Sequence, residues 1–208
     1  MNRRARRIAV VAGALFLLLT GLVWGGVFTD LDRYAVHHLM PWAHFGHHRL
    51  IQAGPMFKPQ IESTLGGTLV ALWTYPASPV ISGLVVLLCA WRLPRHAAIV
   101  AIALWIAANA IELTGKLIVT RPFVGVVGFS DSYPSGHTAR AFVTAAIVAW
   151  TWRRSAVPAF VWAVGVACAL VAIGDHVPTD VIGGALLAVC LVALIASRTP
   201  TRASGSRP

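Results

Sequence analysis

Charged residues are scarce in this sequence, and acidic residues are the scarcest. Of its 208 residues only 12% are charged and 7 are Asp or Glu, whereas 57% are hydrophobic and the mean hydropathy is +0.73. A soluble domain of this size needs more charged residues to cover its surface, so the composition excludes a soluble domain. We therefore expect an integral membrane protein.

Cysteine is also scarce, and no cluster of metal ligands is evident. Cys89, Cys168 and Cys190 lie in apolar segments without paired spacing, and we expect them to be small buried hydrophobic residues. The histidines between residues 37 and 48 are irregularly spaced and lack a cysteine or carboxylate framework, so an amphipathic helix at the membrane surface is favoured over a metal site. We expect no metal and no other cofactor. The aromatic residues that fit this interfacial helix are Tyr34, Trp42 and Phe45.

Six apolar segments dominate the rest of the chain, and each has about the length that crosses a bilayer. They indicate an all-α fold, a bundle of six transmembrane helices in a single domain over residues 1–196, followed by a disordered basic tail at 197–208. The first segment resembles a signal peptide but is long for one and lacks a clear cleavage site, so a membrane helix is favoured over a cleaved signal. Pro76 and Pro79 predict a kink in the second segment. The segments are 8–28, 68–91, 97–114, 137–152, 157–173 and 180–196.

The net charge of +10 could suggest a nucleic-acid partner, but the basic residues sit mainly at segment ends. We interpret them as topology signals and expect no nucleic acid. If six helices alternate, most arginines fall on one side, which the positive-inside rule makes cytoplasmic, together with both termini. The loops at 30–67, 116–137 and 174–180 then face outward from the cell membrane.

Residues 133–137, Tyr-Pro-Ser-Gly-His, end a polar loop and open an apolar segment. Proline suits a first helical turn, Ser135 can cap it, and Gly136 lets the backbone approach a ligand. The unpaired N–H groups of such a turn bind anions, and His137 can exchange a proton near neutral pH. The pattern favours phosphate chemistry, with a plain helix cap and an interfacial histidine as the alternative.

Further polar residues gather at the same predicted outer ends of the last four segments. Lys116 and Arg121 can hold and neutralise a phosphate, and His176 lies four residues before Asp180, close enough for the carboxylate to orient the ring. Two histidines, a carboxylate and cations are sufficient for phosphoryl transfer without a metal.

These residues resemble the type 2 phosphatidic acid phosphatase family, whose three motifs are Lys-x6-Arg-Pro, Pro-Ser-Gly-His and Ser-Arg-x5-His-x3-Asp. The resemblance covers roughly residues 109–189, with the second motif complete at 134–137. It implies that His176 is the nucleophile, Asp180 its orienting carboxylate and His137 the general acid. Lys116, Arg121, Ser135 and Gly136 would bind the phosphate, in a six-helix bundle with an outward-facing site.

Two departures from the family pattern stand out. Lys116 and Arg121 are separated by four residues, so that the usual arginine position falls on Phe123, and Leu170 stands where the third motif has its arginine. Losing a phosphate-facing arginine commonly costs a few kcal/mol of transition-state stabilisation. Arg140, three residues after His137, is a candidate substitute in phosphate binding; the alternative is an arginine that snorkels to the membrane surface.

Glu112 is a carboxylate within a predicted membrane helix, which makes it a functional candidate by default. It lies four residues before Lys116, the favourable spacing for an ion pair on one helix. We therefore expect it to orient Lys116.

The favoured function is hydrolysis of a lipid phosphate or diphosphate, with a phosphorylated lipid as the partner. One alternative is a weak or inactive family member, or a small transporter, that only binds such a lipid. Another is a proton-coupled transporter that uses Glu112 and the histidines, but it would need polar residues near mid-bilayer, and these are scarce.

Overall fold

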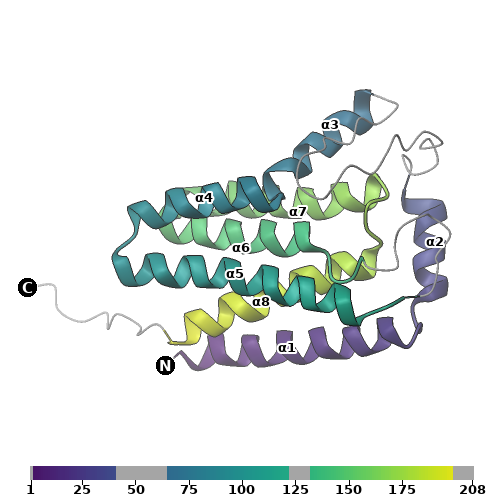
Figure 1. Cartoon of the computed structure of the whole chain (residues 1–208), viewed down its shortest axis with the longest axis horizontal. Helices are drawn as coiled ribbons and strands as arrows, with labels where there is room; N and C mark the ends of the chain where they lie inside the picture. Colours follow the sequence, from purple (N-terminus) through teal and green to yellow (C-terminus); the bar gives the residue numbers. More distant parts are fainter. Residues whose placement is uncertain (1, 41–64, 122–131, 199–208) are drawn as a thin grey trace, which may run out of the picture.

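Helices make up almost the whole of the part that the structure, a computed structural model, describes: residues 2–40, 65–121 and 132–198 (Figure 1). Short 3₁₀ turns, η2 (Tyr75–Ala77) and η3 (Arg153–Ser155), precede α4 and α7. No strand occurs within these residues. The α-helices are α1 (Arg3–Trp24), α2 (Thr29–Leu39), α3 (Leu65–Thr74), α4 (Pro79–Arg92), α5 (Arg95–Ile118), α6 (Gly136–Thr151), α7 (Ala156–Ala172) and α8 (Pro178–Arg198).

The predicted apolar segments coincide with α1, the α3–α4 pair, α5, α6, α7 and α8. Within the described ranges, α1, α5, residues 153–172 and α8 are long and apolar enough to cross a membrane, and the α3–α4 pair counts as a fifth span broken by a 47° bend. The predicted kink lies at this bend, where Ser78 caps α4 and Pro79 occupies its first turn. At 16 residues, α6 is shorter than a typical span.

Helix α6 is the central helix, in contact with α4, α5, α7 and α8 (Figure 1). Its small residues let neighbouring backbones come close, as in membrane helix packing generally. The tightest approach is made by α8, because a Cβ atom on Gly184 would clash with the carbonyl oxygen of Ser135. This contact fixes the start of α8 against the start of α6.

The start of α1 and the end of α8 meet at one end of the bundle. The Asn2 backbone N–H donates to the carbonyl oxygen of Ser197 at 3.1 Å, and α1 runs alongside α8 (Figure 1). The cytoplasmic location of this end, and the outward location of the other, stay predictions.

Helix α2 lies across the opposite end, which we call the α2 end (Figure 1). Val36 and Met40 pack against Val177 of the α7–α8 loop, so this amphipathic helix turns its apolar face to the bundle. Tyr34 is exposed, as an interfacial residue would be. The other predicted interfacial aromatics, Trp42 and Phe45, and His44, His47 and His48 lie outside the described residues.

The expectation of three buried cysteines is only partly correct. Cys89 is buried, Cys190 is intermediate, and Cys168 is exposed. Cys168 lies on α7, one of the candidate membrane spans, where an apolar side chain can face lipid as readily as the bundle interior.

Candidate active site

The Pro-Ser-Gly-His motif opens α6 at the α2 end. Ser135 is the N-cap residue: its hydroxyl oxygen accepts from the Thr138 backbone N–H at 3.3 Å and from the Thr138 hydroxyl at 3.0 Å. The Ser135 backbone N–H donates to the carbonyl oxygen of Asp180 at 3.0 Å, which ties the motif to α8. The serine hydroxyl therefore accepts two hydrogen bonds that shape the start of α6.

Gly136 is required here because a carboxylate lies against it. A Cβ atom at this position would clash with both carboxylate oxygens of Glu112, far inside van der Waals contact. Glu112 of α5 therefore sits at the start of α6, where unpaired backbone N–H groups favour an anion.

Glu112 joins two cations. Its Oε1 atom lies 2.5 Å from Lys116 Nζ, as the spacing predicts, and its Oε2 atom lies 2.9 Å from Arg140 Nη1. Arg140 also donates from Nη1 to Asn109 Oδ1 at 3.2 Å and from Nε to the carbonyl oxygen of Ala77 at 2.8 Å. With only 4% of its surface exposed, Arg140 does not snorkel to the membrane surface, so that alternative is wrong.

The two motif histidines lie within electrostatic reach of each other. Arg140, His176 and Lys116 lie close enough to His137 to interact with it electrostatically, so one neighbourhood contains these four groups. His176 Nδ1 lies 3.3 Å from Asp180 Oδ2. Because a carboxylate only accepts hydrogen bonds, Nδ1 is the donor in this contact, and Nε2 is the ring nitrogen that the contact does not use.

Arg121 is held by two carboxylates, one from α2 and one from α8. Its Nη1 donates to Asp180 Oδ1 at 2.5 Å, and its Nη2 forms a short ion pair with Asp32 Oδ2. The Thr179 hydroxyl donates to the same Asp32 oxygen at 2.8 Å. Burial raises the pKa of the Asp32 carboxyl, and the hydrogen bond from Thr179 and the charge of Arg121 oppose that rise.

Asp32 is the residue that sequence reasoning missed. It is 0% exposed and lies on the same face of α2 as Ala35 and Val36. A carboxylate at i relative to apolar residues at i+3 and i+4 breaks the amphipathic pattern of a helix. That break, in a chain so poor in acidic residues, was the available signal.

The departures from the family motifs have different outcomes. Leu170 is completely buried in an apolar cluster with Ala141, Ala145 and Val166, so no charge replaces the missing arginine there. The carbonyl oxygen of Leu170 accepts from the His176 backbone N–H at 3.2 Å and so still shapes the site loop. Phe123 lies outside the described residues.

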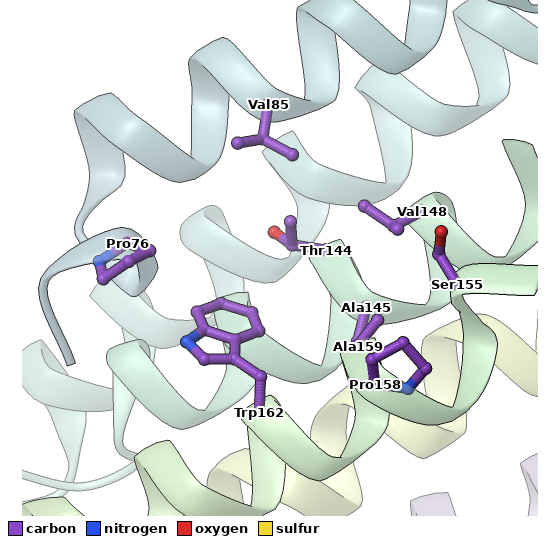
Figure 2. A pocket seen from close by; sticks show the side chains of 9 residues that line it. All are labelled: Pro76, Val85, Thr144, Ala145, Val148, Ser155, Pro158, Ala159 and Trp162. Atoms are coloured by element: carbon purple, nitrogen blue, oxygen red, sulfur yellow. The ribbon is translucent and has the colours of Figure 1, made fainter. Parts of the chain in front are cut away.

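An apolar pocket of about 410 Å³ opens between η2, α4, α6 and α7. Figure 2 shows Pro76, Thr144 and Trp162 around it. Pro76 directly precedes Ala77, whose carbonyl oxygen binds Arg140, so the pocket begins one residue from a contact of the site. The residues that line it are Pro76, Val85, Thr144, Ala145, Val148, Ser155, Pro158, Ala159 and Trp162.

Over the described ranges, no group of three or more His, Cys, Asp or Glu side chains has the arrangement to hold a metal ion. The described part of the site contains two histidines, three carboxylates and three cations: His137 and His176; Asp32, Glu112 and Asp180; Lys116, Arg121 and Arg140.

Comparison with known proteins shows a family and a solved structure to which the chain is similar. A family model described as the PAP2 superfamily matches residues 14–204. The fold resembles the crystal structure of a protein described as the first transmembrane PAP2 type phosphatidylglycerolphosphate phosphatase from Bacillus subtilis, with a TM-score of 0.67, 17% sequence identity, and coverage of 91% of this chain and 94% of that one. No curated protein matches the chain.

Proposed function

Because the chain belongs to the PAP2 superfamily, we propose that it is a membrane phosphatase that hydrolyses a phosphomonoester or diphosphate of a lipid. The observation that carries this proposal is the buried His176–Asp180 pair within reach of a second histidine and two cations. A site that only bound phosphate would need the cations but not an oriented imidazole.

The reaction starts with attack of His176 Nε2 on phosphorus. A nitrogen–phosphorus bond forms as the phosphorus–oxygen bond to the lipid breaks, and His137 gives its proton to the departing oxygen. Asp180 fixes the ring through Nδ1–H and stabilises the positive charge that the ring gains. Water, deprotonated by His137, then attacks phosphorus, and phosphate leaves as His176 is regenerated.

Lys116 and Arg140 are the proposed phosphate-binding cations, together with the first backbone N–H groups of α6. Arg121 remains a predicted phosphate ligand, although both of its Nη atoms bind carboxylates in this structure. Ser135 and Gly136 act by shaping the first turn rather than by direct chemistry.

A lipid substrate fits the surroundings of the site. The site lies at the end of helices long and apolar enough to cross a membrane, and the apolar pocket next to Pro76 can receive a hydrocarbon chain. The site lies opposite the arginine-bearing termini, so we propose that it faces outward.

A specific observation supports one alternative, binding of a lipid phosphate without efficient hydrolysis. Leu170 removes one expected cation, and Glu112 already partly neutralises Lys116 and Arg140.

The test is an assay of the purified full chain in detergent with chelator present. Phosphatidylglycerophosphate, for which the related Bacillus subtilis phosphatase is named, is compared with phosphatidic acid and a polyprenyl diphosphate. We expect phosphate release from at least one of them, its loss in His176→Ala, and none lost in His96→Ala, an exposed histidine at the other end of α5. Activity that needs a divalent ion would contradict the mechanism, and tight binding without release would favour the alternative.

A further inference from the structure

Asp32 is a buried carboxylate that none of the family motifs includes. It comes from α2, is 0% exposed, and contacts two residues of the site region, Arg121 and Thr179. Thr179 directly precedes Asp180, and Arg121 is the cation that binds Asp180. Asp32 therefore contacts both the neighbour and the partner of the orienting carboxylate.

Arg121 is the link between Asp32 and the catalytic pair. One of its Nη atoms binds Asp180 and the other binds Asp32, so the guanidinium bridges two carboxylates. Asp180 in turn accepts from His176 through its other oxygen. The result is a continuous series of hydrogen bonds from Asp32 on α2 to the ring of the proposed nucleophile.

The net charge of Asp32, Arg121 and Asp180 complements the charge that the His176 ring gains during the reaction. Two carboxylates and one guanidinium leave one net negative charge in a buried cluster. When His176 attacks phosphorus its ring gains positive charge, and the cluster becomes neutral overall. Without Asp32, Arg121 alone would neutralise Asp180, and the cationic ring would lack a counter-charge in a medium of low polarity.

We propose that Asp32 is a positioning residue of the catalytic site, which holds Arg121 against Asp180 and supplies the second negative charge that stabilises the positively charged His176 ring. This inference rests on the proposed phosphatase function. It gives α2 a role in catalysis that the motifs do not, and it gives Arg121 a role beside the nucleophile in addition to its predicted contact with phosphate.

The central variant is Asp32→Asn, which keeps the shape and removes the charge. Asp30→Asn is the matched control, because Asp30 lies on the same helix, is almost fully exposed and forms an ion pair with the half-exposed Arg33. We expect kcat to fall by about tenfold or more in Asp32→Asn, with KM changed by less than about threefold, because the loss affects the transition state rather than binding. Asp30→Asn should match the parent protein.

Three further variants separate positioning from a general loss of structure. Asp32→Glu should recover a large part of kcat, because it restores the charge. Thr179→Val removes the hydroxyl that donates to Asp32 and accepts from Arg121 Nη2 at 3.3 Å, keeps both charges, and should lower kcat by less than Asp32→Asn does. In an Arg121→Gln background, Asp32→Asn should lower kcat by less than about threefold, since residues that act through one another are not additive.

Titration of the His176 ring by NMR gives a readout that needs no turnover, with His176→Gln used to assign the signal. Because Asp32→Asn removes a negative charge near the ring, we expect the titration of His176 to move to lower pH in this variant and to stay as in the parent protein in Asp30→Asn. If the parent protein hydrolyses none of the three lipids, the proposed function fails, and this titration alone decides the role of Asp32.

The proposal is overturned if Asp32→Asn behaves like Asp30→Asn, if it changes KM with kcat intact, or if its effect multiplies with that of Arg121→Gln. Should Asp32→Asn fail to fold, Thr179→Val decides by itself: an unchanged kcat and an unchanged His176 pKa refute the proposal.

Discussion

Two buried arginines near the active site are both held by carboxylates, yet their surroundings carry opposite charge. Around Arg140, one carboxylate serves two cations, because Glu112 pairs with both Lys116 and Arg140. Around Arg121, one cation serves two carboxylates, Asp32 and Asp180. We call these the positive triad and the negative triad.

The difference in charge indicates that the two triads have different roles. The positive triad keeps one net positive charge at the N-terminus of α6 and suits a phosphate anion. The negative triad keeps one net negative charge beside His176 and suits a ring that becomes cationic. The same type of residue, a buried arginine, is thus expected to bind substrate in one place and to support the nucleophile in the other. Three predictions test this difference in roles, and the Asp32 variants above test it from the side of the negative triad.

The largest effect is expected from the histidines, one beside each triad. His176→Ala should abolish turnover, because it removes the proposed nucleophile that forms the covalent bond to phosphorus. His137→Ala should retain measurable attack on substrates with good leaving groups, which need less protonation. Turnover of such a substrate by each variant is the measurement.

A covalent intermediate can be trapped to sharpen this result. Labelled phosphate on the protein should be lost in acid and kept in base, as a phosphohistidine is. Label that survives acid, carried by Ser135, would be incompatible with the assignment, and equal residual activity in the two histidine variants would remove the distinction between them.

The next effect is expected in the positive triad. Arg140→Ala should lower turnover by a factor on the order of 100, because it removes a charge-assisted contact to the transition state in a buried site. The measurement is kcat/KM on the best lipid substrate, with Arg154→Ala, an exposed arginine in η3, as the control. A change of less than about threefold would show that Arg140 only ties α6 to η2 through the carbonyl oxygen of Ala77.

The smallest effect is expected for Glu112→Gln, which raises the net charge of the positive triad by one. Removing the carboxylate that competes for Lys116 and Arg140 should tighten the inhibition constant of inorganic phosphate by about threefold to tenfold. Asp30→Asn again serves as the control for loss of an acidic residue. Weaker phosphate inhibition in Glu112→Gln would mean that the carboxylate is needed to place the two cations, as its spacing from Lys116 alone suggests.

Much of the fold could be predicted because bilayer thickness imposes a length on apolar segments. The segments that correspond to α1, α5, α7 and α8 were recognisable for that reason, and Pro76 and Pro79 marked the bend before α4. Local spacing also predicted the pairing of Glu112 with Lys116, since residues four apart share a helix face.

The missed features depend on contacts between distant parts of the chain. Asp32 reaches the site only because α2 folds back over the α7–α8 loop, and no local pattern encodes that packing. The orientation of Arg140 depends on a carbonyl oxygen freed where the chain bends at η2. Whether an arginine faces lipid, a carboxylate or a substrate is decided by such partners, not by its place in a motif.

The position of α2 also bears on what the smallest working enzyme would be. Every motif residue lies in or after α5, so a fragment beginning at α3 would carry all of them. That fragment would nevertheless lack Asp32, and the guanidinium of Arg121 would keep a single carboxylate partner. With the role proposed for Asp32, we expect a minimal catalytic unit to include α2, and because α1 leads directly into α2 and packs along α8, to include the amino-terminal helix as well.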